Sequence, residues 1–286
     1  MNARAPEFAA AAEQDRLVPA LRAESALYVR ALHTARTGRP RDIHALRIAT
    51  RRMLALLEFA AALAPSGKWR GLARELRRPF RKCARLRDLQ ATRAHLRRMR
   101  AGWRGLRPLL DAVLASLRED IRRHQRRAIA GLEAARPRRT TRRIVRLARK
   151  RAASARPADG ARGCIDRSRR NVRAACRRMR TGGIEALHRA RVAIKLCRYQ
   201  LDLAPRLGLR VSPGERLTLR RLQKELGAVT DLELLQHELK RFARHHRGQR
   251  RALAQARGRI RRAREMRRKR ALAMAARDAI VLARTG

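Results

Sequence analysis

The strongest constraint on the fold of this chain is a sequence repeat at an offset of half its length. Residues 44–51 and residues 188–195 share the pattern H-x-x-R-[IV]-A-x-[RK] at an offset of 144 residues. A second match follows at an offset of 143, where Leu76-Arg77-Arg78 corresponds to Leu219-Arg220-Arg221 and Asp88-Leu89 to Asp231-Leu232. Two separate matches with nearly the same offset predict two copies of one unit, related by a pseudo-twofold axis.

The repeated unit is predicted to be helical throughout. Ala, Leu and Arg, which are good helix formers, dominate the chain, and β-branched residues never alternate over the length of a strand. We therefore expect an all-α fold made of an internally duplicated pair of helical bundles. Pro, Gly and capping residues predict helices over about 9–37, 42–64, 68–86, 88–101, 108–136, 140–155, 165–180, 184–204, 213–226, from 230, and from 249 onward.

Some boundaries in this series are specific predictions. Pro79 is expected to kink or break the third helix, Pro108 to lie in the first turn of a helix, and Thr140 or Thr141 to cap the next one. Residues 156–163, which read RPADGARG, are the best linker candidate. They divide a single domain over 1–286 into a first helical repeat (9–155) and a second (164–284).

The charge of the chain predicts its partner class. Lys and Arg number 75 and Asp and Glu 23, a net charge of +52, while hydrophobic residues make up 45% and suffice for a core. A polyanion is therefore expected. No apolar run reaches the roughly 20 residues of a membrane span, and no secretory signal is recognisable, which predicts a cytoplasmic protein that does not bind membranes.

The positive charge is unevenly distributed along the chain. Residues 1–38 carry five basic and four acidic residues, which favours a packing role for the first helix. Residues 138–181 and 240–286 each carry 17 basic and two acidic residues. These two segments either extend the binding face or form solvated helix surfaces.

The repeated motif places basic residues on one side of a helix. At 100° per residue, His44, Arg47 and Arg51 project from one stripe, and so do His188, Arg191 and Lys195 in the second copy. Arg52 and Arg198 lie at the borders of these stripes, and apolar residues occupy the opposite faces. The stripes hold no carboxylate, so they differ from ordinary exposed helix faces, although a solvated basic face is the alternative interpretation.

Such a stripe suits phosphate. The planar fork of Arg matches phosphate oxygens, Lys acts as a point charge, and His near a polyanion is expected to have a raised pKa. Glycine-rich phosphate loops are absent from the sequence, so side chains would hold the phosphates. Asp88 and Asp231 each begin a predicted helix, where they would cap its N-terminus, orient a neighbour such as Arg85, Arg87 or Lys224, or do both.

Cys and His show no spacing typical of a metal site. Cys83, Cys164, Cys176 and Cys197 lie within helical patterns, which predicts four small buried side chains. No CxxC pair or HExxH motif is present, so neither a metal nor another cofactor is expected.

At these residues the chain resembles the CHAD domain family, the conserved histidine α-helical domain. The resemblance lies in His44–Arg52, Arg85–Leu89, His188–Tyr199 and Gln223–Leu232 and spans residues 9 to 284. It implies two related helical bundles that bind inorganic polyphosphate through a basic central surface or pore, and association with polyphosphate granules. The implied polyphosphate-binding residues are His44, Arg47, Arg51, Arg52, Arg77, Arg81, Arg85, Arg87, His188, Arg191, Lys195, Arg198, Arg220 and Lys224.

The chain departs from the family pattern at a few positions. Leu54 stands where the first-half motif often has a basic residue, and Ala228 and Thr230 replace the basic type found at Arg85 and Arg87. The two halves are therefore expected to differ in affinity.

Three functions compete on the sequence alone. The leading hypothesis is non-catalytic polyphosphate binding. The second is nonspecific, weak nucleic-acid binding, which net charge favours equally, although 3% aromatic residues argue against stacking on single strands. The third is an enzyme acting on polyphosphate. It lacks clustered carboxylates for Mg²⁺, so it would depend on a phosphohistidine at His44 or His188.

Overall fold

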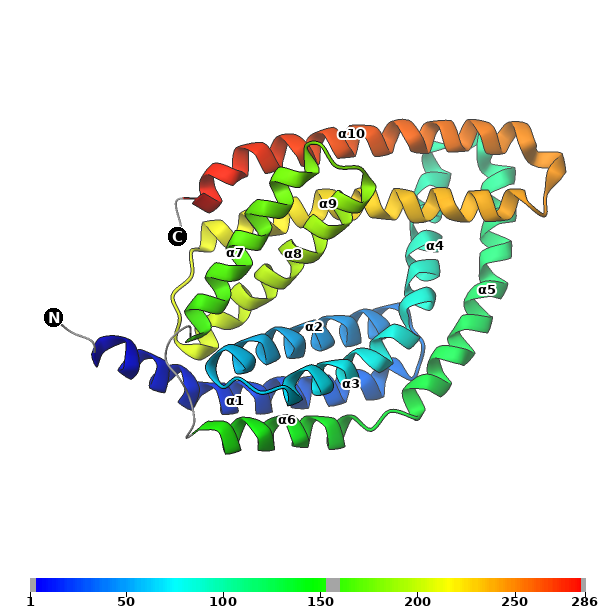
Figure 1. The fold of residues 1–286 in the computed structure, drawn as a ribbon. Helices are drawn as coiled ribbons and strands as arrows, with labels where there is room; N and C mark the ends of the chain where they lie inside the picture. The colour runs from blue at the N-terminus through cyan, green and yellow to red at the C-terminus, as the bar shows by residue number, and fades with distance from the viewer. Residues whose placement is uncertain (1–3, 153–159, 284–286) are drawn as a thin grey trace.

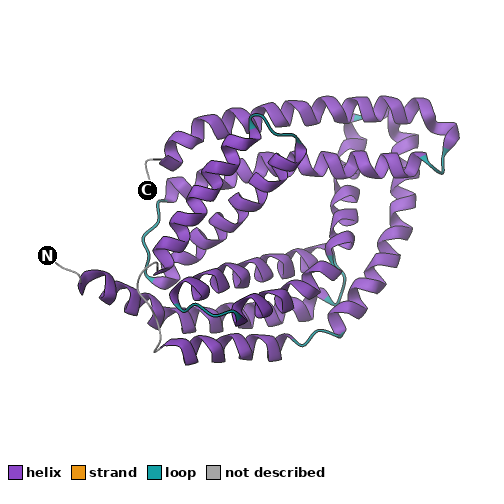
Figure 2. Cartoon of the chain, in the orientation of Figure 1, coloured by secondary structure: helices purple, strands orange, loops and turns teal. Residues whose placement is uncertain are grey.

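The computed structural model describes residues 4–152 and 160–283, and all regular structure within these ranges is helical (Figure 2). This confirms the all-α part of the predicted fold class. The α-helices are α1 (Arg4–Ala35), α2 (Pro40–Leu63), α3 (Lys68–Lys82), α4 (Ala84–Gly102), α5 (Arg107–Glu133), α6 (Pro137–Ala152), α7 (Gly160–Met179), α8 (Ile184–Leu203), α9 (Pro213–Ala243) and α10 (Arg250–Ala283). Three short 3₁₀ segments, η1 (Arg104–Leu106), η2 (Ala204–Leu207) and η3 (Arg247–Gln249), connect some of them. No helix in the described part of the chain has the length and apolarity to cross a membrane.

The helices form a four-sided frame (Figure 1). Helices α1, α2, α3 and α6 run along one side, α4 and α5 turn up the next, α9 and α10 lie along the third, and α7 and α8 close the fourth. The antiparallel neighbours α1–α2, α7–α8 and α9–α10 pack most extensively, and α2 also packs against α7 and α8. As a result, α2, α4, α8 and α9 lie on the inner edges of the frame.

The apolar stripes predicted for α2 and α8 form the core. Ile43, Leu46, Met53 and Leu57 are buried on α2, and α8 buries the equivalent face. The four cysteines are buried as predicted. Burial of one stripe on each amphipathic helix fixes its rotation about its own axis, so the basic stripe of the same helix must face away from the core.

Buried carboxylates join the helices to one another. Glu24 of α1 accepts two hydrogen bonds from Arg52 of α2, at 2.7 and 2.5 Å, and Glu215 of α9 accepts two from Arg169 of α7, at 2.8 and 2.7 Å. Both carboxylate side chains are fully buried. Breaking a buried ion pair leaves an uncompensated charge inside the protein and is strongly destabilising. Each pair therefore fixes the register of two helices.

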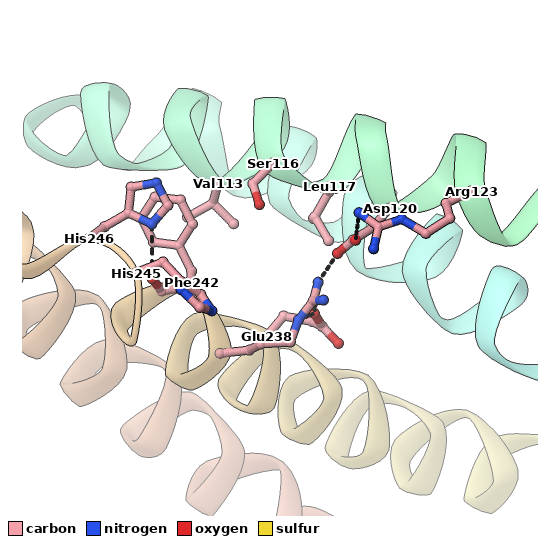
Figure 3. Close-up of a pocket in the computed structure, with 10 residues that line it drawn as sticks. Val113, Ser116, Leu117, Asp120, Arg123, Glu238, Phe242, His245 and His246 are labelled. Atoms are coloured by element: carbon pink, nitrogen blue, oxygen red, sulfur yellow. Dashed lines mark hydrogen bonds and ion pairs between the residues drawn. The ribbon is translucent and has the colours of Figure 1, made fainter.

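A third junction lies where α5 approaches α9 (Figure 3). Arg241 of α9 bonds both Asp120 of α5 and Glu238 of its own helix, and Arg85 of α4 bonds Glu238 at 2.6 Å. Burial tends to raise the pKa of Asp120, but the hydrogen bond and charge of Arg241 outweigh it and lower that pKa. The carboxylates of Asp120 and Glu238 therefore connect three helices, α4, α5 and α9.

Several predicted helix boundaries are confirmed. The α1–α2 turn contains Gly38 at φ 67°, where an added Cβ would lie 2.6 Å from the side chain of Gln125. Pro108 lies in the first turn of α5, and the Ser212 hydroxyl accepts a hydrogen bond from the backbone N–H of Glu215 at the start of α9. These are positions where backbone geometry, rather than packing, selects the residue.

Other boundaries are wrong. Pro79 neither ends nor divides α3, which continues to Lys82, and the chain turns at Cys83. The expected break before Thr230 does not exist, because α9 runs through Gly227 without interruption. Gly227 therefore forms no turn. A Cβ added at Gly227 would meet nothing within 4 Å, so the glycine destabilises the helix only through the conformational entropy that it loses on folding.

The capping roles predicted for Asp88, Asp231 and Thr140 or Thr141 are also wrong. Asp88 is the fifth residue of α4 and Asp231 lies inside α9, so neither caps an N-terminus. Helix α6 begins at Pro137, and Thr141 bonds back to the Pro137 carbonyl at 2.9 Å. Of the predicted linker, residues 156–159 lie outside the described residues and 160–163 form the first turn of α7.

Candidate functional site

A cavity of about 560 Å³ lies where the inner helices of the frame converge. We call it the basic cavity. Its wall comes from α2, α4, α8 and α9, with one residue from α10. The lining residues are His44, Ile48, Arg51, Arg87, His95, Arg98, Arg191, Lys195, Arg198, Tyr199, Gln223, Lys224, Gly227, Ala228, Asp231 and Arg267.

Half of the sequence-predicted site residues come together in this wall. From the first half of the chain these are His44, Arg51 and Arg87, and from the second half they are Arg191, Lys195, Arg198, Lys224 and Asp231. Residues 104 (Arg87 and Arg191) to 187 (His44 and Asp231) positions apart in the sequence thus share one cavity. The basic stripes of α2 and α8 reach it because the opposite faces of both helices are held in the core.

Three of the predicted residues form ion pairs with carboxylates outside the basic cavity. Arg52 is held by the buried Glu24, and Arg85 by the buried Glu238. Arg220 pairs with Asp202 at 3.3 Å. These guanidinium groups stabilise helix contacts, and none of the three lines the basic cavity.

The remaining predicted residues lie outside the lining for other reasons. His188, near the start of α8, and Arg81, near the end of α3, are exposed, and Arg77 is half-buried on α3. The guanidinium of Arg47 lies 4.6 Å from the centre of the Phe80 ring, beside Arg51, which lies 5.6 Å from it. Asp88 pairs with Arg87 at 3.1 Å, consistent with the orienting role considered for it.

The wall of the basic cavity holds cationic groups that form no ion pair with a carboxylate of the described residues. Within the described residues no ion pair forms to Arg51, Arg191 or Lys195. Burial and the charges of Arg51, Arg191, Arg47 and Arg87 lower the pKa of Lys195 to about 6. Burial, and then the charges of nearby arginines, also lower the pKa of Arg47 to about 10. The cavity is therefore an environment in which a further positive charge is unfavourable and a negative charge is favoured.

The histidine in the repeat responds to the same field. Burial, followed by the charges of Arg87, Arg47 and Arg51, lowers the pKa of His44. In the free protein the shift is thus opposite to the rise expected next to a polyanion. Binding of an anion would reverse it, since an opposite charge favours imidazolium.

Three buried polar atoms around the cavity have no hydrogen-bond partner among the described residues. They are Arg191 Nε, His95 Nδ1 and Asp231 Oδ1, and all three residues line the cavity. Buried polar atoms in folded proteins are nearly always satisfied, by protein, water or ligand. A phosphate oxygen would accept a hydrogen bond from Arg191 Nε, whereas Asp231 Oδ1 is itself an acceptor and needs a donor such as water.

Sequence reasoning missed His95, Arg98 and Arg267 as site residues. His95 follows Asp88 by seven positions, two helical turns, and therefore lies on the same face of α4, a signal present in the sequence. Arg267 lies within the basic segment 240–286, and it pairs with Glu225 at 3.0 Å. Nothing in its local sequence separates it from the other arginines of α10.

Comparisons with known proteins agree with this architecture. The family model of the CHAD domain matches residues 19–213. No curated protein matches the chain. Among solved structures, the CHAD domain from the plant Ricinus communis superposes with a TM-score of 0.71 at 21% identity, covering 92% of this chain and 91% of that one. PptA from Streptomyces chartreusis superposes with a TM-score of 0.61 at 20% identity, covering 93% and 98%. Because the family model spans more than half of the residues, and because the solved structures share the fold, the chain belongs to the CHAD domain family.

Proposed function

We propose that this protein binds inorganic polyphosphate in the basic cavity and does not turn it over. The observation that carries the proposal is the concentration of Arg51, Arg87, Arg191 and Lys195 in one partly buried wall, next to polar atoms without partners. Fixed guanidinium forks and an ammonium group provide charge-assisted hydrogen bonds to successive phosphates. A linear chain without bases requires only such donors.

The proposal includes a duplicated binding surface. Arg51 and Lys195 are equivalent in the repeat, and both line the basic cavity. The two equivalent Asp-Leu segments each contribute to the lining as well, the first through Arg87 and the second through Ala228. We infer that two related halves face each other across a basic centre. The first half contributes Arg87 where the second has Thr230, so the first half is expected to bind more tightly.

Catalysis is not required by the residues present. Enzymes that transfer phosphoryl groups hold Mg²⁺ through carboxylates and the substrate phosphates. Asp231 is the one carboxylate among the described residues that line the basic cavity, and Arg191 and His95 lie within its electrostatic reach. Release of phosphate from polyphosphate, or its transfer from ATP, by highly purified protein with Mg²⁺ would contradict this part of the proposal.

The decisive measurement is binding of long-chain polyphosphate and of duplex DNA at matched charge, across a salt titration. We expect tighter binding of polyphosphate at physiological salt. A cavity variant (Arg51→Gln, Arg87→Gln, Arg191→Gln and Lys195→Gln) should lose at least about a hundredfold in affinity, since the loss of only two charge-assisted hydrogen bonds, at about 1.5 kcal/mol each, already costs that much.

A matched control removes four charges from an exposed helix face. The α5 control variant (Arg118→Gln, Arg122→Gln, Arg126→Gln and Arg127→Gln) changes residues that are all exposed and do not line the basic cavity. We expect it to lose less than about threefold. Equal losses in the two variants, or equal affinity for DNA and polyphosphate, would reduce the function to nonspecific charge attraction and favour nucleic-acid binding.

Association with polyphosphate granules follows from this proposal. The wild-type protein and the α5 control variant should co-sediment with isolated granules, whereas the cavity variant should remain in the supernatant. Retention of the cavity variant on granules would show that another surface carries the association.

A further inference from the structure

A second basic surface lies on the outer side of the frame, away from the basic cavity. A groove of about 1150 Å³ runs between the end of α1 and the beginning of α6. In Figure 1, α6 runs alongside α1 at the edge of the molecule opposite α9 and α10. The groove and the basic cavity share no lining residue and no helix, so they are independent features.

Eight of the fourteen residues that line this groove are arginines. Arg138, Arg142 and Arg146 follow one another at every fourth position of α6, which aligns them along one face of the helix. Further arginines and a histidine contribute from both helices, and the apolar lining is limited to small and aliphatic side chains. The charged lining residues are Arg30, His33, Arg36, Arg136, Arg138, Arg139, Arg142, Arg143 and Arg146.

Little acidic charge compensates this groove. Glu75 of α3 takes a hydrogen bond from Arg143 at 2.6 Å and another from Thr140 at 3.1 Å, and these bonds attach α6 to α3. No carboxylate stands among the lining residues of the described chain. In addition, Arg36 Nε is buried and has no hydrogen-bond partner in the described part of the chain. An anion in the groove would relieve both the mutual repulsion and the unsatisfied donor.

The shape and composition of the groove distinguish between polyanions. A duplex is usually read by a helix that enters its major groove, but α6 packs against α1 and α3 and cannot enter one. Single-stranded nucleic acid is usually held by aromatic side chains that stack on bases, and the described lining has no Phe, Tyr or Trp. A slender chain of phosphates without bases fits a concave, aromatic-free, arginine-lined groove.

We propose that the α1–α6 groove is a second binding site for a linear phosphate chain, separate from the basic cavity. The choice of ligand rests on the proposed function, whereas the existence of the site does not. Two sites on different sides of one molecule allow two polyphosphate chains, or two parts of a long one, to be held together. The protein would then cross-link polyphosphate rather than only coat it.

The test uses three variants of the full chain that each remove four charges. The groove variant (Arg138→Gln, Arg139→Gln, Arg142→Gln and Arg146→Gln) changes exposed residues only, so the fold should be retained, and the α5 control variant matches it in charge, exposure and helix context. The probe is a short polyphosphate chain of defined length. The readouts are titration calorimetry and protection of the backbone amides of residues 138–146 from hydrogen exchange.

We expect about two chains bound per wild-type protein and per α5 control, and one per groove variant or cavity variant. The groove variant should bind long-chain polyphosphate about tenfold more weakly than the α5 control. Amide protection over 138–146 should persist in the cavity variant. A groove variant that behaves like the α5 control, without loss of a site or of protection, would overturn the groove site and leave the basic cavity unaffected.

Two other outcomes separate this inference from the proposed function. If the cavity variant binds like the wild type while the groove variant loses binding, the proposed function of the basic cavity fails and the groove stands. If duplex DNA of matched charge protects the amides of residues 138–146 and polyphosphate does not, the groove is a nucleic-acid surface and the ligand assignment is overturned.

Discussion

At the scale of single residues, the basic cavity is lined by cations with and without a carboxylate partner. Among the described residues, Arg51, Arg191 and Lys195 form no ion pair, whereas Arg87 and Arg198 pair with Asp88 and Asp202. Arg51 and Arg52 are neighbours in sequence, yet Arg52 is held by Glu24 and Arg51 lines the basic cavity. Lys195 is the clearest result of this separation, because burial among four arginines lowers its pKa to about 6. A side chain that is largely neutral at pH 7 in the free protein becomes a cation when an anion arrives.

Binding of polyphosphate is therefore expected to take up protons. The anion restores the charged forms of Lys195 and His44, so their pKa values rise on binding, and affinity should fall as pH increases above about 6. Calorimetry at pH 7 in two buffers of different ionisation enthalpy measures the uptake.

The matched variant for this prediction is Lys195→Arg. Its guanidinium stays protonated, so most of the proton uptake and most of the pH dependence of affinity should vanish while binding persists. Release of protons by the wild type, or an uptake unchanged in Lys195→Arg, would contradict the assigned role of Lys195.

At the scale of helices, the basic faces are held in position by buried carboxylates that join one helix to another. Glu24, Glu215, Glu238 and Asp120 are all buried, and each bonds an arginine of another helix. Helix α9 takes part in two of these junctions, and it continues through Gly227, which lines the basic cavity. One continuous helix thus connects the α7 corner with the α4 and α5 corner.

Removing one of these carboxylates should destabilise the fold more than removing a surface carboxylate. Glu215→Gln leaves Arg169 buried with only Asp166 at 2.8 Å, and we expect a loss of about 3 kcal/mol in the free energy of unfolding. Urea denaturation measures it.

The comparison variant is Glu119→Gln, which breaks an exposed pair with Arg122 at 3.8 Å and should cost less than about 0.5 kcal/mol. Similar losses in the two variants would show that the α7–α9 pair does not hold these helices together.

At the scale of the whole molecule, the net charge of +52 is a cost to folding that anions reduce. The repulsion between cations is concentrated in the basic cavity, on the inner edges of the frame, and in the α1–α6 groove, on its outer side. Screening by salt acts on both, and a bound polyanion also adds its binding free energy to the folded state.

The melting temperature should therefore rise with sodium chloride and rise further with polyphosphate at equal ionic strength. Differential scanning fluorimetry measures both. The cavity variant should start from a higher melting temperature without ligand, because its repulsion is relieved, and should gain less from polyphosphate than the α5 control variant does. A melting temperature that falls with salt would mean that attractive ion pairs outweigh repulsion over the whole surface.

The sequence by itself determined the helical class, most helix positions, the buried stripes of α2 and α8, and the family. These depend on local periodicity and on the His-Arg motifs, which are readable within one or two helical turns. Of the two basic stripes that the sequence predicted, His44, Arg51, Arg191 and Lys195 line the basic cavity, whereas their stripe neighbours Arg47 and His188 do not.

Only the tertiary structure decided which cations are free to bind. Arg52 finds its partner 28 residues away and Arg85 finds one 153 residues away, and no local pattern encodes such pairs. The same holds for the groove, whose walls come from helices about a hundred residues apart in sequence. Charge is a property of each residue, but compensation of charge is a property of residue pairs, and folding decides which pairs form.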